Sequence, residues 1–279
     1  MNASAVIQHL STWMKDYVTT EERDGFVVGV SGGVDSAVAS TLACLTGMPV
    51  LCLFLPIHQH QAECERAQAH LSWLTRKYGN AECLSVDLTA LHDALMATLR
   101  GPHPGGADEV LAEINTKSRS RLAALYYYAA ARKFLVLGTG NRVEQRGVGF
   151  FAKFGDGGMD LAPMVNLYKT EVYELARALG VEQALIDAAP TDGLWPDGRT
   201  DMDQLGATYP ELEWAMDLRD GAVVTDDLEL SERQKEVLRI YDERHADNEH
   251  KRRPAPEAPI PWSLRCIPAS DIGRENSIH

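Results

Sequence analysis

The sequence has no apolar stretch long enough to cross a membrane, and its first residues lack the basic start and apolar run of a secretion signal. Cysteine is also scarce. The five cysteines, an odd number, are scattered along the chain, and no two have the C-x-x-C spacing of metal and redox motifs. Such thiols are typical of buried, reduced cysteines in the cytosol. We therefore predict a soluble, cytoplasmic protein without structural disulfides or a membrane partner.

Positive charge is in short supply as well. There are 27 lysines and arginines against 40 aspartates and glutamates, which gives a formal net charge of −13. Proteins that bind nucleic acid rely on basic side chains to neutralise phosphates, so a chain of this charge predicts no nucleic-acid partner. A local basic pocket is compatible with the acidic balance, because its field acts at short range. The composition therefore favours a small anionic ligand held in a pocket.

Hydrophobic residues make up 45% of the chain, which is enough for a sizeable core. Short apolar runs alternate with helical patterns in the first half, and the second half is mostly helical. This alternation predicts an α/β fold with a Rossmann-like, doubly wound parallel sheet and a helical C-terminal part. We expect one domain over residues 1–253, followed by a tail over 254–279. The expected strands are 25–30, 49–55, 82–86 and 134–137, and the expected helices are 1–20, 34–46, 59–78, 88–99, 109–132, 169–179 and 231–244.

The most informative stretch is Ser31-Gly32-Gly33-Val34-Asp35-Ser36, where the first apolar strand gives way to a helix. The two glycines allow the backbone to bend tightly and to approach an anion. The start of the following helix offers unpaired N–H groups and the positive end of its dipole, and both serines add hydroxyl donors. The alternative is a plain strand-to-helix turn capped by Ser31. The complete six-residue pattern directly after a strand argues against it.

This turn resembles the S-G-G-x-D-S signature of the PP-loop ATP pyrophosphatases, which grip the pyrophosphate that leaves ATP. It is not a Walker loop, since the Gly-Lys-Ser/Thr sequence is missing. The resemblance implies that Asp35 binds magnesium. A carboxylate beside a polyphosphate would be repelled without a cation between them. Mg²⁺ commonly binds through one or two carboxylates together with substrate phosphates.

Further motifs narrow the resemblance to the NAD synthetases, over residues 26 to 253 approximately. They are Asn115-Thr116-Lys117-Ser118-Arg119-Ser120-Arg121, Gly138-Thr139-Gly140-Asn141 followed by Glu144, Phe150-Phe151-Ala152-Lys153-Phe154-Gly155-Asp156-Gly157-Gly158-Met159-Asp160, Leu167-Tyr168-Lys169, Pro190-Thr191-Asp192 and Glu249-His250-Lys251-Arg252. Two departures stand out. The segment between Glu144 and Lys153 is slightly longer than in the family, with Gln145-Arg146 inserted. The segment between Thr191 and His250 is also extended.

The resemblance implies roles for particular residues. Asp35 and Lys169 would be catalytic, and Asp35 and Glu144 would bind Mg²⁺. ATP would be bound by Gly29, Val30, Ser31, Gly32, Gly33, Val34, Asp35, Ser36, Thr139, Lys169 and Thr191. Deamido-NAD would be bound by Arg119, Lys153, Asp160, His250 and Lys251.

Two of these roles have a physical argument beside the resemblance. Lys169 falls in the first turn of an expected helix, where a cation opposes the helix dipole, and a ligand phosphate shared by the lysine and the helix end would remove that conflict. Arg119 shares a helix face with Asn115, whereas Arg121 points elsewhere. A guanidinium fork at Arg119 suits the pyrophosphate of a dinucleotide, although a solvated basic helix face is the alternative.

The resemblance implies that ATP activates the nicotinate carboxylate of deamido-NAD as an acyl-adenylate. Ammonia then attacks this intermediate to give NAD, AMP and pyrophosphate. The phosphate turn begins at Ser31, which leaves no room before it for a glutaminase domain. We therefore expect free ammonia, or a separate glutaminase partner, as the nitrogen source. The family also implies a homodimer.

Two other functions are kept as alternatives. One is another PP-loop ATP pyrophosphatase, such as a tRNA-modifying enzyme or a small-molecule amidotransferase. The acidic charge and the scattered cysteines disfavour a tRNA substrate. The other is a non-catalytic adenine nucleotide sensor, which would need neither Glu144, Lys169 nor Arg119.

Two smaller features stay open at this point. His58 and His60 follow the second strand, but two histidines without a third ligand indicate surface or packing residues more than a metal site. Trp195 lies in a polar loop over residues 191–203. That loop is interpreted either as a mobile lid over the site or as the seat of an ordinary packed tryptophan.

Overall fold

The structure of the protein is a computed structural model that describes residues 1–99, 106–222 and 230–264. In chain order its elements are α1 (Ala3–Thr20), β1 (Gly25–Gly29), α2 (Val34–Leu45), β2 (Val50–Phe54), α3 (Gln61–Lys77), β3 (Ala81–Ser85), α4 (Thr89–Leu99), α5 (Ala107–Arg132), β4 (Phe134–Leu137), the π-helix η1 (Val143–Val148), α6 (Lys169–Leu179), α7 (Gln183–Ile186), α8 (Asp201–Leu205), α9 (Tyr209–Arg219), α10 (Glu232–Asp247), α11 (Glu249–Arg252) and a short 3-10 helix η2 (Trp262–Leu264).

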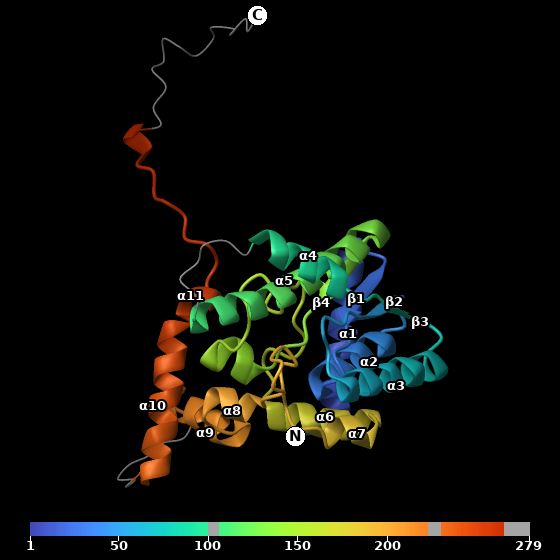
Figure 1. The fold of residues 1–279 in the computed structure, drawn as a ribbon. Coiled ribbons are helices and arrows are strands. Elements are labelled where there is room, and N and C mark those ends of the chain that lie inside the picture. Colours follow the sequence, from blue (N-terminus) through green and yellow to red (C-terminus); the bar gives the residue numbers. More distant parts are fainter. Residues whose placement is uncertain (100–105, 223–229, 265–279) are drawn as a thin grey trace, which may run out of the picture.

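The four strands form one parallel sheet in the order β3-β2-β1-β4 (Figure 1). The chain moves outward from β1 to β3 and then crosses to the other side of β1 to form β4. The point where the strand order reverses therefore lies between β1 and β4. Open α/β sheets bind ligands in the crevice outside the carboxyl ends of the strands at such a point.

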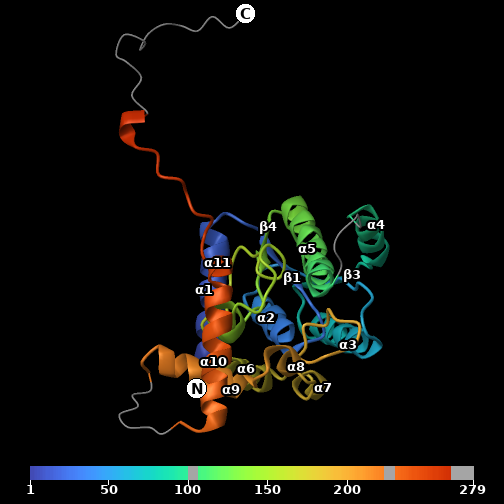
Figure 2. The same cartoon turned by 60° about the vertical axis from the view of Figure 1, so that its left-hand side comes forward.

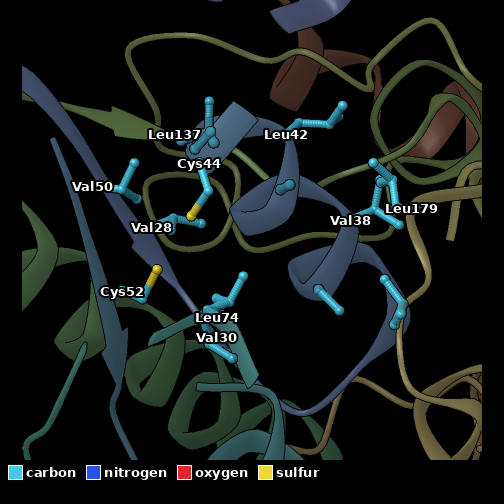
Figure 3. Packing of buried hydrophobic residues seen from close by; sticks show 14 of the residues in the cluster. Val28, Val30, Val38, Leu42, Cys44, Val50, Cys52, Leu74, Leu137 and Leu179 are labelled. Carbon is cyan, nitrogen blue, oxygen red and sulfur yellow. The ribbon is translucent and has the colours of Figure 1, made fainter. Parts of the chain in front are cut away.

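Helices cover both faces of the sheet, as the apolar strands require. Alternate strand residues point to opposite faces, so Val28 and Cys52 pack with α1, α2, α3 and α6, while Val27 and Leu51 pack with α5. Figure 3 shows Val28 and Cys52 from the sheet beside Val38 and Leu42 from α2 in the first of these clusters. The predicted doubly wound α/β fold is confirmed.

A second core joins the C-terminal helices to the π-helix. Helices α9 and α10 lie side by side (Figures 1 and 2). Leu212 and Met216 of α9 and Val237 and Tyr241 of α10 pack with Val143 at the start of η1. The sequence predicted α10 in this region but not the short helices α7, α8, α9 and α11. Their amphipathic patterns are brief, although α8 and α9 each begin with a capping box, such as Thr208 with Glu211, which is a local signal.

Residues 254–264 extend from α11 with exposed side chains where these are described, and residues 265–279 of the predicted tail lie outside the described residues (Figure 1). Cys44, Cys52, Cys64 and Cys83 are free thiols, as expected, and Cys266 lies outside the described residues. Within 1–99, 106–222 and 230–264, no helix has both the length and the apolar character needed to cross a membrane.

His70 is a fully buried histidine, and its burial leads to a prediction about the pH dependence of stability. Its ring is fully buried between α2 and α3, contacts the Ser40 hydroxyl at 3.0 Å, and stacks on Trp73. Burial lowers the pKa of His70 to about 4, so the folded protein keeps the ring neutral where the unfolded chain takes up a proton. The stabilising effect is therefore present above pH 6.5 and is lost as the pH falls toward 4.

We expect His70→Gln to flatten this pH dependence, because glutamine does not titrate. Between pH 7 and pH 5, the parent protein should lose about 2 kcal/mol more free energy of unfolding than the variant. Urea denaturation at both pH values measures the difference. Equal losses in the two proteins would contradict the assignment.

Candidate active site

The turn between β1 and α2 is held in shape by its own serines. The Ser36 hydroxyl accepts a hydrogen bond from the Ser31 backbone N–H at 3.1 Å and donates to the Gly33 carbonyl at 2.9 Å, and the Gly33 N–H donates to the Ser31 hydroxyl. These bonds curl the backbone so that α2 starts at Val34 with N–H groups open at its first turn. The turn therefore has the form of an anion cradle, as the sequence predicted.

Gly32 is required at its position in this turn. Its φ is +87°, in the left-handed region, and a Cβ there would lie 2.5 Å from the Glu63 carbonyl oxygen of α3. The turn and the first part of α3 are thus packed backbone against backbone. A side chain at residue 32 would force the two apart.

A cavity of about 230 Å³ opens beside the turn at the carboxyl ends of the strands. The predicted ATP-binding residues meet there, although they come from four separate parts of the chain. Those that line it are Gly29, Val30, Ser31, Gly33, Asp35, Ser36, Thr139, Lys169 and Thr191, and the remaining two, Gly32 and Val34, line a smaller cavity that adjoins it. Their roles as ligands of ATP stay predictions.

The centre of the cavity is a buried cluster of charges around Lys169. This lysine, only 4% exposed, contacts Asp35 in a short ion pair and Glu144 at 3.4 Å. The Asn141 side-chain amide donates to the Asp35 carboxylate at 3.3 Å, and the Asn141 backbone N–H donates to the Glu144 carboxylate at 3.3 Å, so one residue orients both carboxylates. The two predicted catalytic residues and the two predicted metal ligands thus form one contact network.

Burial and charge shift the protonation of this cluster. Desolvation alone would lower the pKa of Lys169, but Asp35, Glu144 and Asp201 outweigh it and raise the pKa well above its usual value. Desolvation raises the pKa of Glu144 to about 7, although Lys169 opposes the shift. The lysine is therefore a permanent cation, whereas the cluster holds more carboxylates than one cation can balance.

Asp201 is a third carboxylate at this site, and the sequence did not single it out. It is 4% exposed and accepts a hydrogen bond from the Tyr209 hydroxyl at 2.7 Å, and that hydroxyl also contacts Glu144 at 2.8 Å. Its second oxygen is buried without a partner among the described residues. Three ionised carboxylates against Lys169 would leave two negative charges, which a divalent cation balances. The donor set therefore fits a divalent cation such as Mg²⁺, and the roles of Asp35 and Glu144 as its ligands stay predictions.

The segment that was predicted to carry an insertion, Gln145-Arg146, has an unusual local structure. Residues Val143–Val148 form a π-helix, which accommodates one more residue per turn than an α-helix does, and Glu144 lies in its first turn. A Cβ at Gly140 would lie 2.5 Å from the Gln145 amide nitrogen, so the Gln145 side chain would have to move. Within this helix the Glu144 carboxylate lies 3.4 Å from the Lys169 ammonium.

The residues predicted for deamido-NAD gather around the loop from Phe150 to Asp160, outside the lining of the main cavity. Arg119 donates to the Lys153 carbonyl at 3.3 Å, and the Lys153 ammonium donates to the His250 carbonyl at 2.7 Å. Lys251 donates to two carbonyls of the same loop, those of Gly149 and Phe151. The structure therefore brings Arg119, Lys153, His250 and Lys251 together, and their substrate contacts stay predictions.

Asp160 lies apart from the other four. One of its carboxylate oxygens accepts from the Val136 N–H at 2.7 Å and the other from the Tyr126 hydroxyl at 3.0 Å. The cavity is instead lined by Arg121, whose guanidinium donates to the Leu55 carbonyl and to the Gln59 side chain. The helical spacing had placed Arg121 on a different face from Arg119, and that face is the one that meets the cavity.

The loop that contains Trp195 is fixed by side chains from distant elements. Gln59, Lys117 and His60 contact the carbonyls of Gly193, Leu194 and Trp195, respectively. Its Trp195 indole donates to Gln204 at 2.7 Å and stacks with Arg199. His60 thus contacts the loop, and His58 pairs with Asp93. Both histidines therefore contact protein groups, and their interpretation as surface or packing residues stays a prediction.

The chain is similar to known proteins over most of its length. The family model described as NAD synthase matches residues 6–255. The NH(3)-dependent NAD(+) synthetase of Finegoldia magna is 35% identical over 257 residues, covering 91% of this chain and 95% of that protein. The enzyme of the same name from Syntrophomonas wolfei is 37% identical over 268 residues, covering 95% and 100%.

Two solved structures are also similar to this chain. The NMN synthetase of Francisella tularensis superposes with a TM-score of 0.80 and 32% identity, covering 93% of this chain and 100% of that one. The NH3-dependent NAD synthetase of Campylobacter jejuni has a TM-score of 0.69 over the same shares, and its 23% identity shows a common fold.

The packing of the turn generates a prediction about Gly32. We expect Gly32→Ala to lower the free energy of unfolding by about 3 kcal/mol, because it combines a strained φ with a backbone clash. It should also raise the concentration of ATP needed for half-maximal binding. Gly47→Ala is the matched control, since Gly47 has φ +75° but nothing within 4 Å of an added Cβ.

The control should cost about 1 to 2 kcal/mol and leave ATP binding unchanged. Urea denaturation and nucleotide titration of both variants measure these effects. Similar results for the two glycines would show that the contact with α3 is unimportant.

Proposed function

The chain belongs to the NAD synthase family, and from this premise we propose that it uses ATP to amidate the nicotinate carboxylate of deamido-NAD with ammonia, forming NAD, AMP and pyrophosphate. The observation that carries the proposal is the contact of Lys169 with Asp35 and Glu144 at the mouth of the phosphate turn. The family and its curated relatives favour a carbon–nitrogen ligase over a tRNA-modifying enzyme or a nucleotide sensor.

Activation is the first requirement of this reaction. A carboxylate is a poor partner for ammonia, because its leaving group would be an oxide ion. One oxygen of the carboxylate attacks the α-phosphorus of ATP and forms an oxygen–phosphorus bond, while the bond between that phosphorus and pyrophosphate breaks. AMP then becomes the leaving group in the second step. The chain's contribution is positioning and charge stabilisation.

The residues of the site divide this work. The N–H groups and hydroxyls between Ser31 and Ser36 receive the departing pyrophosphate, and Lys169 neutralises part of its charge. Asp35 and Glu144 would hold Mg²⁺, which supplies further neutralisation of the phosphate oxygens when it is bound. The loop that includes Thr191 closes one wall of the cavity and excludes water from the adenylate.

A second candidate substrate comes from the likeness to an NMN synthetase. Nicotinate mononucleotide has the same carboxylate as deamido-NAD but lacks the second nucleotide. The activation chemistry would be identical, and only the contacts to the remote half of the substrate would differ. The loop from Phe150 to Asp160, with Arg119 and Lys153 beside it, is where those contacts would arise.

Three further proposals complete the assignment. Free ammonia is the nitrogen source, in line with the names of the curated relatives, although a separate glutaminase could supply it. The active form is a homodimer, and light scattering of the purified protein tests this. The site of action is the cytoplasm.

The first prediction concerns the products. The protein incubated with ATP, Mg²⁺, ammonia and deamido-NAD should release AMP, pyrophosphate and NAD in equal amounts. Lys169→Met should lower the rate by about 100- to 1,000-fold, since it removes the cation that meets the developing charge. Chromatography of the nucleotides and a pyrophosphate assay measure both. Formation of ADP and phosphate would rule out the adenylate route.

The second prediction concerns the substrate. With deamido-NAD and nicotinate mononucleotide offered at equal concentrations, we expect more NAD than NMN, because the dinucleotide makes additional contacts. Mass spectrometry of the products gives the ratio of the two kcat/KM values. A ratio in favour of NMN would transfer the assignment to the mononucleotide and leave the adenylation chemistry unchanged.

A further inference from the structure

A second cavity of about 40 Å³ adjoins the first on the α3 side of the phosphate turn. The two cavities share Ser31, Gly33, Asp35, Lys169 and Thr191 in their linings. A volume of this size holds a few water molecules, which is comparable to one phosphoryl group. The small cavity is thus an extension of the phosphate site, and neither the motifs nor the family resemblance assigned residues of α3 to it.

Arg66 is the basic residue that α3 contributes to this cavity. Its Nε donates to the Gly32 carbonyl at 3.0 Å, so the guanidinium is drawn to the turn and the side chain is only half-exposed. Among the described residues, no carboxylate forms an ion pair with it. Lys169, the other cation of this lining, is held by Asp35 and Glu144.

An arginine that is partly buried and has no ion-pair partner among the described residues is unusual. Long basic side chains on a helix ordinarily extend into solvent or pair with an acid, because a partly buried cation without a partner loses hydration. Glu63 is one turn away on the same helix and lines the same cavity, yet Arg66 bonds to the Gly32 carbonyl instead. That single bond uses one of the five N–H donors of the guanidinium, and the remaining fork suits phosphate oxygens.

We propose that Arg66 binds the distal phosphoryl group of ATP and of the pyrophosphate that leaves it. The inference rests on the proposed function and adds a residue to it. When the bond between the α-phosphorus and the bridging oxygen breaks, that oxygen keeps the electron pair and the pyrophosphate gains negative charge. A guanidinium on the far phosphoryl group therefore stabilises the departing pyrophosphate more than bound ATP. The guanidinium also offsets the repulsion between that phosphoryl group and the carboxylates of Glu63 and Asp192, which line the same cavity.

The test measures binding of magnesium pyrophosphate to the purified full-length protein by calorimetry, without nucleotide. Arg66→Gln keeps a donor for the Gly32 carbonyl but removes the charge, and should weaken binding about tenfold. Arg66→Lys keeps the charge but lacks the forked donors, and should weaken binding less than the glutamine variant does. The matched control is Arg76→Gln, the same change at an exposed position further along α3, which should have no effect.

A second measurement distinguishes a direct contact of Arg66 with pyrophosphate from an indirect effect through the shape of the phosphate turn. Product inhibition by AMP should be the same in all variants, whereas inhibition by pyrophosphate should weaken in Arg66→Gln. Unchanged pyrophosphate binding in that variant, or equal weakening of AMP and pyrophosphate, would overturn the proposal. Circular dichroism checks that each variant is folded, and Arg66→Met replaces the glutamine variant if that one is not.

The two levels of inference can fail separately. If the parent protein binds pyrophosphate through Arg66 but forms no AMP from ATP and deamido-NAD, the proposed function fails and the phosphate contact stands. If NAD and AMP are formed normally while Arg66→Gln binds pyrophosphate as tightly as the parent protein, the proposed function stands and the role of Arg66 is wrong.

Discussion

The contact of the Lys169 ammonium with Asp35 and Glu144 is the interaction on which the site depends. It joins the turn after β1, the π-helix after β4 and the first turn of α6. Burying two carboxylates without a cation would cost several kcal/mol of solvation, so the three segments are held together by charge as well as by packing. The same cation opposes the dipole of its own helix, and this conflict is tolerated because Asp35 and Glu144 surround it.

The cluster around Lys169 has more carboxylates than cations, and this excess of negative charge favours the binding of a further cation. Asp201 and Glu144 share one Tyr209 hydroxyl, and an oxygen of Asp201 is left without a partner in the described part of the chain. Burial raises the pKa of both carboxyls, to about 6 for Asp201 and about 7 for Glu144. A site built in this way is pre-organised for a cation, which reduces the repulsion among its carboxylates. The bound cation would in turn attract phosphate oxygens.

A second constraint fixes the loop around which the residues predicted to bind deamido-NAD gather. Side chains of α10, of α11 and of Asn248 between them bond to carbonyls at the end of the π-helix and just after it, more than ninety positions away in sequence. Asn248 donates to Val148, Lys251 donates to Gly149 and Phe151, and His245 contacts Gly147. Because an irregular loop leaves its carbonyls without regular partners, these contacts satisfy them and join the C-terminal core to the sheet. The extended segment before His250 forms the helices that bring α11 to this place.

The sequence alone determined the strands, the main helices and the phosphate turn. Each of these is a local pattern, an apolar run, a helical period or two glycines before a helix, whose effect is exerted within a few residues. Only the tertiary structure decided that Asp201, Tyr209, Arg121 and Arg66 face the site. Their roles depend on distances between elements far apart in the chain, and an aspartate at a helix start or an arginine on a helix has the same local signal whether it meets solvent or a cavity. The long-range packing of the helices against the turn, which no short window of sequence contains, makes that choice.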